Sequence, residues 1–163
     1  MLILYLVNHF NLPTNKSSLL VGTTLSIVHI SNIVGAFIAE KYLGYFITSI
    51  LGSALMTFGS IFLCFFHGLF FLHIALGIIS VSIGLILVNI SSFIARHYDQ
   101  EKSSHSERGF GFSLFFIFIN LGGVVGGAVS TSLANKYGYN QAFYTILISN
   151  FFIIAMQIIG IIV

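Results

Sequence analysis

An uncharged stretch of sequence constrains the fold of this chain more than any other feature. After Arg108 the next charged residue is Lys136, so the 27 residues at positions 109–135 carry no charge. At about 1.5 Å of rise per residue, they would form a helix of roughly 40 Å. Because the hydrocarbon core of a bilayer is about 30 Å thick, this stretch predicts a helix that crosses a membrane.

The composition supports the same interpretation for the whole chain. Hydrophobic residues make up 57% of it and charged residues 6%, whereas about a quarter of an ordinary soluble domain is charged. The sequence therefore predicts an integral membrane protein embedded in a lipid bilayer. A net charge of +2, dispersed along the chain, argues against nucleic acid as a partner. With Cys64 as the only cysteine, no internal disulfide is possible.

The apolar segments predict an all-α, multi-spanning fold of one domain, residues 1–163. Short polar breaks divide the chain into six helices at about residues 1–12, 17–39, 46–66, 70–95, 109–135 and 139–163. The first is too short to span a membrane and ends at Pro13, so it is a half-helix, a re-entrant piece or the end of a span whose beginning is missing. The last is bulky and almost entirely apolar, which is typical of a helix that faces lipid.

A polar loop at 96–108 and the distribution of Lys and Arg predict the orientation. Alternate loops place four cations on one side of the membrane and two on the other, and the side richer in Lys and Arg faces the cytoplasm. The four are Lys41, Arg96, Lys102 and Arg108, and the two are Lys16 and Lys136. We therefore expect a cytoplasmic N-terminus in the cell membrane, which would be the inner membrane in a bacterium.

Two polar side chains lie deep inside predicted spans. Asn120 sits in the middle of the helix at 109–135, and an amide at that depth needs a neighbouring helix or a polar cavity as partner. The glycines that follow it allow close approach, so we expect this helix to be packed on both sides. His29 is the most deeply placed ionisable residue; it either marks an ion or substrate path or is a neutral histidine hydrogen-bonded between helices.

The sequence lacks the patterns of catalytic and cofactor sites. No glycine-rich loop ends in Lys-Ser or Lys-Thr, and Gly109-Phe-Gly111 is not continued into a dinucleotide fingerprint. His97 and His105 are not spaced with other ligands as in a zinc site, so we expect no metal. The predicted helices offer no carboxylate for a Ser/His/Asp set. We therefore predict no enzyme and no cofactor, and movement of a solute past polar helix faces is the better hypothesis.

Three blocks together resemble the proton-dependent oligopeptide transporter family of the major facilitator superfamily. They are GAFIAEKYLGYFIT at 35–48, ALGIISVSIGLILVNISSF at 75–93 and RGFGFSLFFIFINLGG at 108–123. The resemblance implies that the chain is the N-terminal six-helix half of a transporter that moves di- and tripeptides together with protons by alternating access. It also implies that the first, second, fourth and fifth helices line a central cavity and that the other two face lipid.

The resemblance assigns substrate contacts to three side chains. Asn120 matches an asparagine that lines the peptide site in the family, Phe116 replaces a tyrosine, and His29 falls where a binding-site tyrosine is often found. Leu87 takes the place of a membrane-embedded lysine, and leucine offers no charge. His29, with an unperturbed pKa of about 6.5, is therefore the candidate for proton coupling.

The same resemblance identifies a cytoplasmic gating loop. It also implies that one motif and the second half of the family's fold are absent from this sequence. Glu40 stands for the family's loop aspartate, and Gly44 belongs to the same loop. The family's Glu-x-x-Glu-Arg motif would lie before Met1, and the second six-helix half does not follow. Three interpretations stay open: a transporter fragment that cannot transport alone, an inert remnant of a broken transporter gene, and a structural half-bundle that assembles with a second chain.

Overall fold

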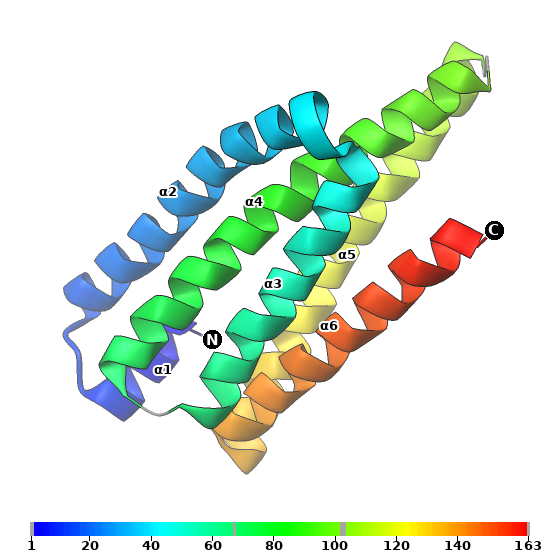
Figure 1. Cartoon of the computed structure of the whole chain (residues 1–163). Helices are drawn as coiled ribbons and strands as arrows, with labels where there is room; N and C mark the ends of the chain where they lie inside the picture. Colours follow the sequence, from blue (N-terminus) through cyan, green and yellow to red (C-terminus); the bar gives the residue numbers. More distant parts are fainter. Residues whose placement is uncertain (1, 67, 102–103, 163) are drawn as a thin grey trace.

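A computed structural model describes residues 2–66, 68–101 and 104–162 of the chain. Within those ranges the chain forms six α-helices and no strand, so the predicted all-α fold is confirmed (Figure 1). The helices are α1 (Leu2–Phe10), α2 (Thr14–Ile38), α3 (Tyr45–Phe65), α4 (Leu69–Gln100), α5 (His105–Tyr137) and α6 (Tyr139–Ile162). Five of them, α2 to α6, are long and apolar enough to cross a membrane, whereas α1 has only nine residues.

The predicted loop at 96–108 is wrong over most of its length. α4 continues to Gln100 and α5 already begins at His105, so helix extends beyond the apolar stretch on both sides of the connection. Hydropathy marks where a helix leaves the membrane, but the polar residues that follow can continue it. Lys102, one of the cations counted for orientation, lies outside the described residues, as do the predicted helix ends at 1 and 163.

A capping box explains where α5 begins. The Glu107 N–H donates to Ser104 Oγ at 3.3 Å, and the Ser104 N–H donates to the Glu107 carboxylate at 2.8 Å. This reciprocal pair satisfies two backbone donors that a helix N-terminus leaves free. The hydrogen bonds from the Ser104 N–H and then its hydroxyl hold the pKa of Glu107 below its ordinary value. An ion pair between Arg108 and Asp99 joins the first turn of α5 to the end of α4.

α4 lies between α2 and α3, and α6 packs on the other side of α3 (Figure 1). Close approach of α2 and α4 depends on Gly84, whose hypothetical Cβ would lie 2.4 Å from the Ser31 Cβ. In the same way, a Cβ on Gly52 of α3 would lie 2.9 Å from side-chain atoms of α4. Without side chains at these two points, the backbones can pack directly against each other.

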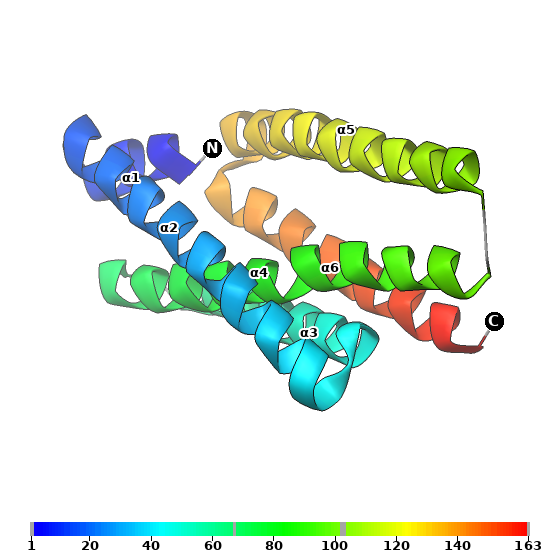
Figure 2. The same ribbon diagram turned by 90° about the horizontal axis from the view of Figure 1, so that it is seen from above.

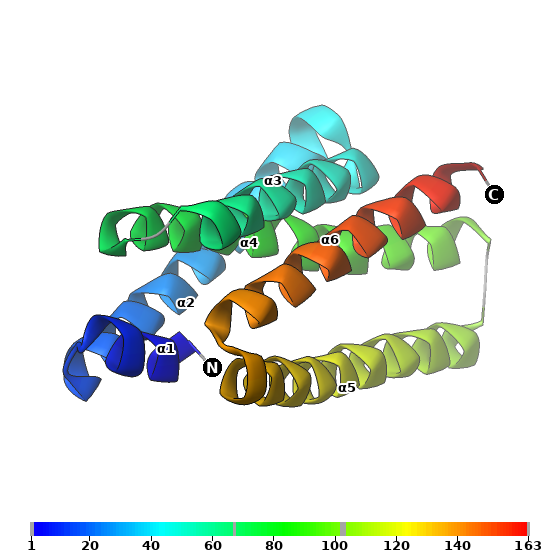
Figure 3. The same cartoon turned by 90° about the horizontal axis from the view of Figure 1, so that it is seen from below.

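α5 stands apart from this layer of helices. Figures 2 and 3 show it running beside the others and meeting α6 where the two are joined. Ala134, near that junction, is the only buried residue among those described in α5. The expectation that this helix is packed on both sides is therefore wrong for this chain.

The short α1 is fixed by an apolar cluster at one end of the bundle. Leu6 is fully buried, and the Tyr5 ring meets the Phe143 ring of α6 edge-to-face at 5.1 Å between centroids. Cys64 of α3 and Leu72 of α4 complete the buried contacts around them. The cluster thus packs α1 against residues of α3, α4 and α6.

Two amide side chains tie α6 to α3. Asn150 Nδ2 donates to Ser60 Oγ at 2.7 Å, and Gln157 Nε2 donates to Ser49 Oγ at 3.0 Å. Asn150 is 3% exposed, so α6 is not merely the lipid-facing helix that its bulky sequence indicated. Interhelical hydrogen bonds of this kind stabilise membrane bundles modestly, because the separated helices find other partners.

Replacing Asn150 by leucine is expected to lower the stability of the bundle by about 1 kcal/mol, since it removes the buried bond to Ser60 between α6 and α3. The neighbouring Ser149 is the matched control. It is exposed, and its hydroxyl donates only to Thr145 O of its own helix, so Ser149→Ala should change little. Unfolding of both variants in detergent measures the difference, and equal stabilities would contradict a role for the Asn150–Ser60 bond.

Candidate functional site

α5 carries two of the three predicted substrate contacts on an open surface. Asn120 is exposed, and its Nδ2 donates to the Phe116 carbonyl at 2.8 Å, one turn earlier in the same helix. The Phe116 side chain is 56% exposed. The amide therefore satisfies one donor locally and leaves its carbonyl oxygen available to a group outside the bundle.

A groove runs along the glycine-rich part of α5, between this helix and the α3–α6 side of the bundle. It consists of two adjacent cavities of ≈ 340 Å³ and ≈ 630 Å³. The residues common to both are Met56, Gly126, Gly127, Ser130 and Ile146. We call this feature the α5 groove.

The glycines of the α5 groove face open space. A Cβ added at Gly122, Gly123, Gly126 or Gly127 would meet nothing within 4 Å. Gly123 and Gly127 follow Asn120 by three and seven residues, so the amide lies on the border of the groove side of α5. The small-residue pattern is therefore present but has no neighbouring backbone against it in this structure.

His29 lies on α2, away from the helix that packs against it. The buried residues of α2 are Ser17, Ser31 and Gly35, and the latter two pack on α4. The His29 side chain is exposed, and no described residue makes a hydrogen bond to its ring. The structure thus does not show a histidine bonded between helices, and it does not bring His29 into contact with Asn120.

The predicted gating residues form the sharp connection between α2 and α3. A π-helical turn at Ala39–Leu43 contains the exposed Glu40, which has no ion pair with any described residue. Gly44 follows with φ of +80°, a conformation that favours glycine, and its N–H donates to Ala39 O at 2.8 Å. The two residues are thus four positions apart on one hydrogen-bonded turn rather than on a long loop.

Asn89 joins α4 to α2 at a point that the sequence analysis did not identify. Its side chain is 0% exposed, and Nδ2 donates to Leu85 O at 2.6 Å and to Gly35 O of α2 at 3.4 Å. Its Oδ1 is buried without a partner among the described residues. An asparagine inside an apolar span is the signal that could have identified this contact. Leu87, two residues earlier, is 46% exposed.

Comparison with known proteins places these features in a family. The sequence profile described as Major Facilitator Superfamily matches residues 1–161. A di-/tripeptide transporter of Lactococcus lactis subsp. lactis (strain IL1403) is 30% identical over 132 residues, which are 81% of this chain and 26% of that protein. The dipeptide and tripeptide permease B of Aliivibrio fischeri (strain MJ11) is 31% identical over 144 residues, 87% of this chain and 28% of the permease.

Solved structures share the arrangement of these helices. A crystal structure of a mutant of the peptide transporter POT, in complex with alafosfalin, superimposes with a TM-score of 0.89 and 23% identity. The match covers 96% of this chain and 33% of that one. The POT family transporter PepTSo superimposes with a TM-score of 0.83 and 22% identity, over 92% and 30% of the two chains. This chain therefore spans about a quarter to a third of the proteins that it matches.

Proposed function

This chain belongs to the major facilitator superfamily, and we propose that it forms the N-terminal wall of a transporter that moves di- and tripeptides with protons by alternating access. One observation carries the proposal: 96% of the chain superimposes on a third of a peptide transporter. The relatives named as di-/tripeptide transporters support the same substrate class.

The chain would act in the cell membrane with its N-terminus in the cytoplasm. A cysteine placed at Ser106 tests that orientation, because a reagent that cannot cross the membrane should then label it only from the cytoplasmic side.

The substrate contacts in this proposal are Asn120 and Phe116 on α5 and His29 on α2. All three side chains are exposed on helices that the bundle leaves open, so a further wall could close over them. The turn with Glu40 and Gly44 would move with α2 and α3 as a unit, because its backbone is hydrogen-bonded into both helices.

The isolated chain is expected not to transport. A transporter site lies between two repeats, and this chain offers one wall with an open α5 groove. Vesicles that contain only this chain should take up no more labelled dipeptide than protein-free vesicles. Uptake by the chain alone would overturn the proposal that it is one wall.

A half-bundle that assembles with a second chain is the second candidate, favoured by the bare glycines of α5. The same vesicles, supplied with a C-terminal half from a relative, separate the two candidates. Recovered uptake supports a transporter wall. Stable association without uptake supports a structural half-bundle.

His29→Gln is expected to reduce the pH-driven part of uptake in a transporter completed around this chain. Glutamine keeps a polar side chain of similar length but has no group that binds and releases a proton. His73→Gln is the matched control, because His73 lies on α4 with its Nδ1 2.6 Å from Leu69 O. Dipeptide uptake is measured with and without a pH gradient, and unchanged pH-driven uptake in His29→Gln would exclude this histidine from coupling.

A further inference from the structure

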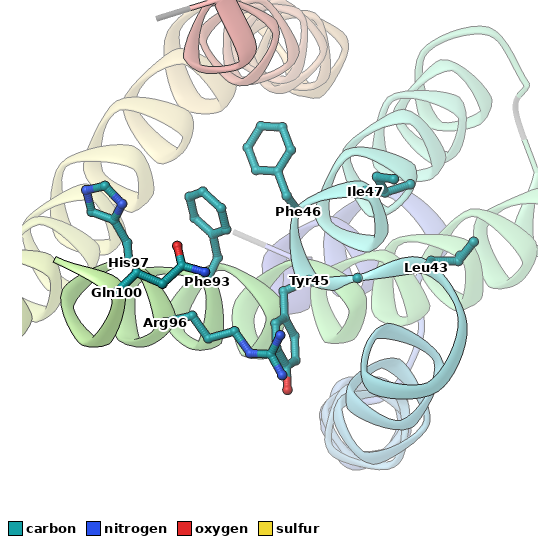
Figure 4. Close-up of a pocket in the computed structure, with 9 residues that line it drawn as sticks. Leu43, Tyr45, Phe46, Ile47, Phe93, Arg96, His97 and Gln100 are labelled. Carbon is teal, nitrogen blue, oxygen red and sulfur yellow. The ribbon is translucent and has the colours of Figure 1, made fainter. Parts of the chain in front are cut away.

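A pocket of ≈ 420 Å³ lies where α3 begins and α4 ends, away from the proposed substrate contacts (Figure 4). It is lined by Leu43, Gly44, Tyr45, Phe46, Ile47, Phe93, Arg96, His97 and Gln100. One cation, one imidazole and one amide therefore share the pocket with aromatic and aliphatic side chains, and no acidic residue lines it.

The pocket lies at the depth of lipid headgroups. α3 has 21 residues, which span roughly 32 Å, so its first residue, Tyr45, falls at one boundary of the hydrocarbon core. Arg96 lies at the same end, since both residues line the pocket. Tyrosine is enriched at this boundary, where arginine can extend its charge toward the headgroups.

Arg96 carries a positive charge that no carboxylate of the described residues neutralises. Its guanidinium lies over the Tyr45 ring, 4.7 Å from the centroid, as Figure 4 shows. Within the described ranges Arg108 pairs with Asp99, and His97 Nε2 lies 3.6 Å from the Glu101 carboxylate. Because His97 already faces a carboxylate, Arg96 is the cation that the pocket offers to an anion.

The backbone of α3 adds hydrogen-bond donors beside this charge. Gly44 precedes the helix and has no side chain, and no side-chain hydrogen bond caps the N-terminus. The first N–H groups of a helix have no partner within it, and the helix dipole favours an anion there. These donors belong to Tyr45, Phe46 and Ile47, which line the same pocket as Arg96.

The apolar part of the pocket distinguishes a lipid from a soluble anion. The Phe46 and Phe93 rings lie 5.0 Å apart and point to the same side in Figure 4. Ile47, the next residue of α3, lines the same pocket and is 53% exposed. An inorganic phosphate would use only the charged groups, whereas an acyl chain would also cover this surface. We propose that the pocket binds an anionic phospholipid, with its phosphate on Arg96 and the start of α3 and its acyl chain along Phe46 and Ile47.

Native mass spectrometry of the full chain in detergent tests this proposal. We expect phosphatidylglycerol to bind more tightly than phosphatidylcholine, and Arg96→Gln to weaken phosphatidylglycerol about tenfold, as loss of one charge-assisted hydrogen bond would. Lys136→Gln is the matched control. It removes the same charge at another site, where Lys136 Nζ lies 5.1 Å from the centroid of the Tyr137 ring, and it should leave binding unchanged.

Three further comparisons separate a lipid site at Arg96 from other causes of weaker binding. Arg96→Lys retains the charge and should retain more binding than Arg96→Gln, which excludes a folding defect as the cause. Equal losses in Arg96→Gln and Lys136→Gln would overturn the site in favour of a general charge effect. Competition by glycerol phosphate at the concentration of the lipid would overturn the lipid assignment, because it would show that the acyl chain contributes nothing.

Discussion

Replacing Gly84 by leucine is expected to push α2 away from α4 and to lower the free energy of unfolding by about 3 kcal/mol, the upper part of the usual range for overpacking. A Cβ at this position would lie 2.4 Å from the Ser31 Cβ and 2.7 Å from the Ser31 backbone carbon. A backbone atom cannot rotate away as the end of a long side chain can. The clash would therefore be relieved by separating the two helices, which would also stretch the bond from Asn89 to Gly35 O.

Gly77→Leu is the control for this prediction because Gly77 lies on the same helix with nothing within 4 Å of its hypothetical Cβ. Leucine there should be neutral or should stabilise the helix by up to about 0.8 kcal/mol through its higher helix propensity. Thermal unfolding of both variants in detergent provides the comparison. A Gly84→Leu protein as stable as Gly77→Leu would show that α2 and α4 do not pack through this glycine.

The helices could be predicted from the sequence because one strong effect, the need to hydrogen-bond the backbone inside a bilayer, determines where they form. Each of the five long helices contains an uncharged apolar run of membrane length, and water cannot satisfy the backbone inside a bilayer. The predicted helix boundaries were less accurate outside the apolar stretches, where this effect no longer acts. α4 and α5 extend through 96–100 and 105–108, where capping and polar helix formers decide the outcome instead.

The packing of α5 could not be predicted from its small residues. Glycine allows close approach but does not determine which helix comes close. The glycines of α3 have that neighbour, since Gly52 meets α4, whereas Gly126 and Gly127 line an open groove. Glycines therefore have opposite outcomes in two helices of one chain.

The family was recognised correctly from the order of three sequence blocks, and the similarity to di-/tripeptide transporters confirms it. The positions of the proposed substrate contacts alone would not have indicated a peptide as the substrate. The side chains proposed to contact substrate are exposed, with Asn120 and Phe116 on α5 and His29 apart from them on α2, so they define no closed pocket within this chain. The buried amides of Asn89 and Asn150 instead join helices of the bundle, and their partners are seen only in the structure.

In a transporter completed around this chain, Gly127→Leu is expected to lower dipeptide uptake about tenfold or more, since filling a helix interface costs 1–3 kcal/mol. The same change should leave the isolated chain intact, because nothing lies within 4 Å of its hypothetical Cβ. A mutation that harms only the assembled protein would show that the α5 groove is where the remaining helices pack. Uptake by vesicles and unfolding of the isolated chain are the two measurements.

Gly109→Leu separates an effect at the groove from an effect on α5 as a helix. Gly109 lies in the first turns of the same helix, also has nothing within 4 Å, and does not line either cavity. It should therefore leave uptake near the level of the unmodified protein. If Gly109→Leu and Gly127→Leu reduced uptake equally, the loss would follow from a stiffer α5, since leucine replaces glycine in both. If neither did, α5 would face lipid in the assembled transporter, and Asn120 on its border could not contact a peptide.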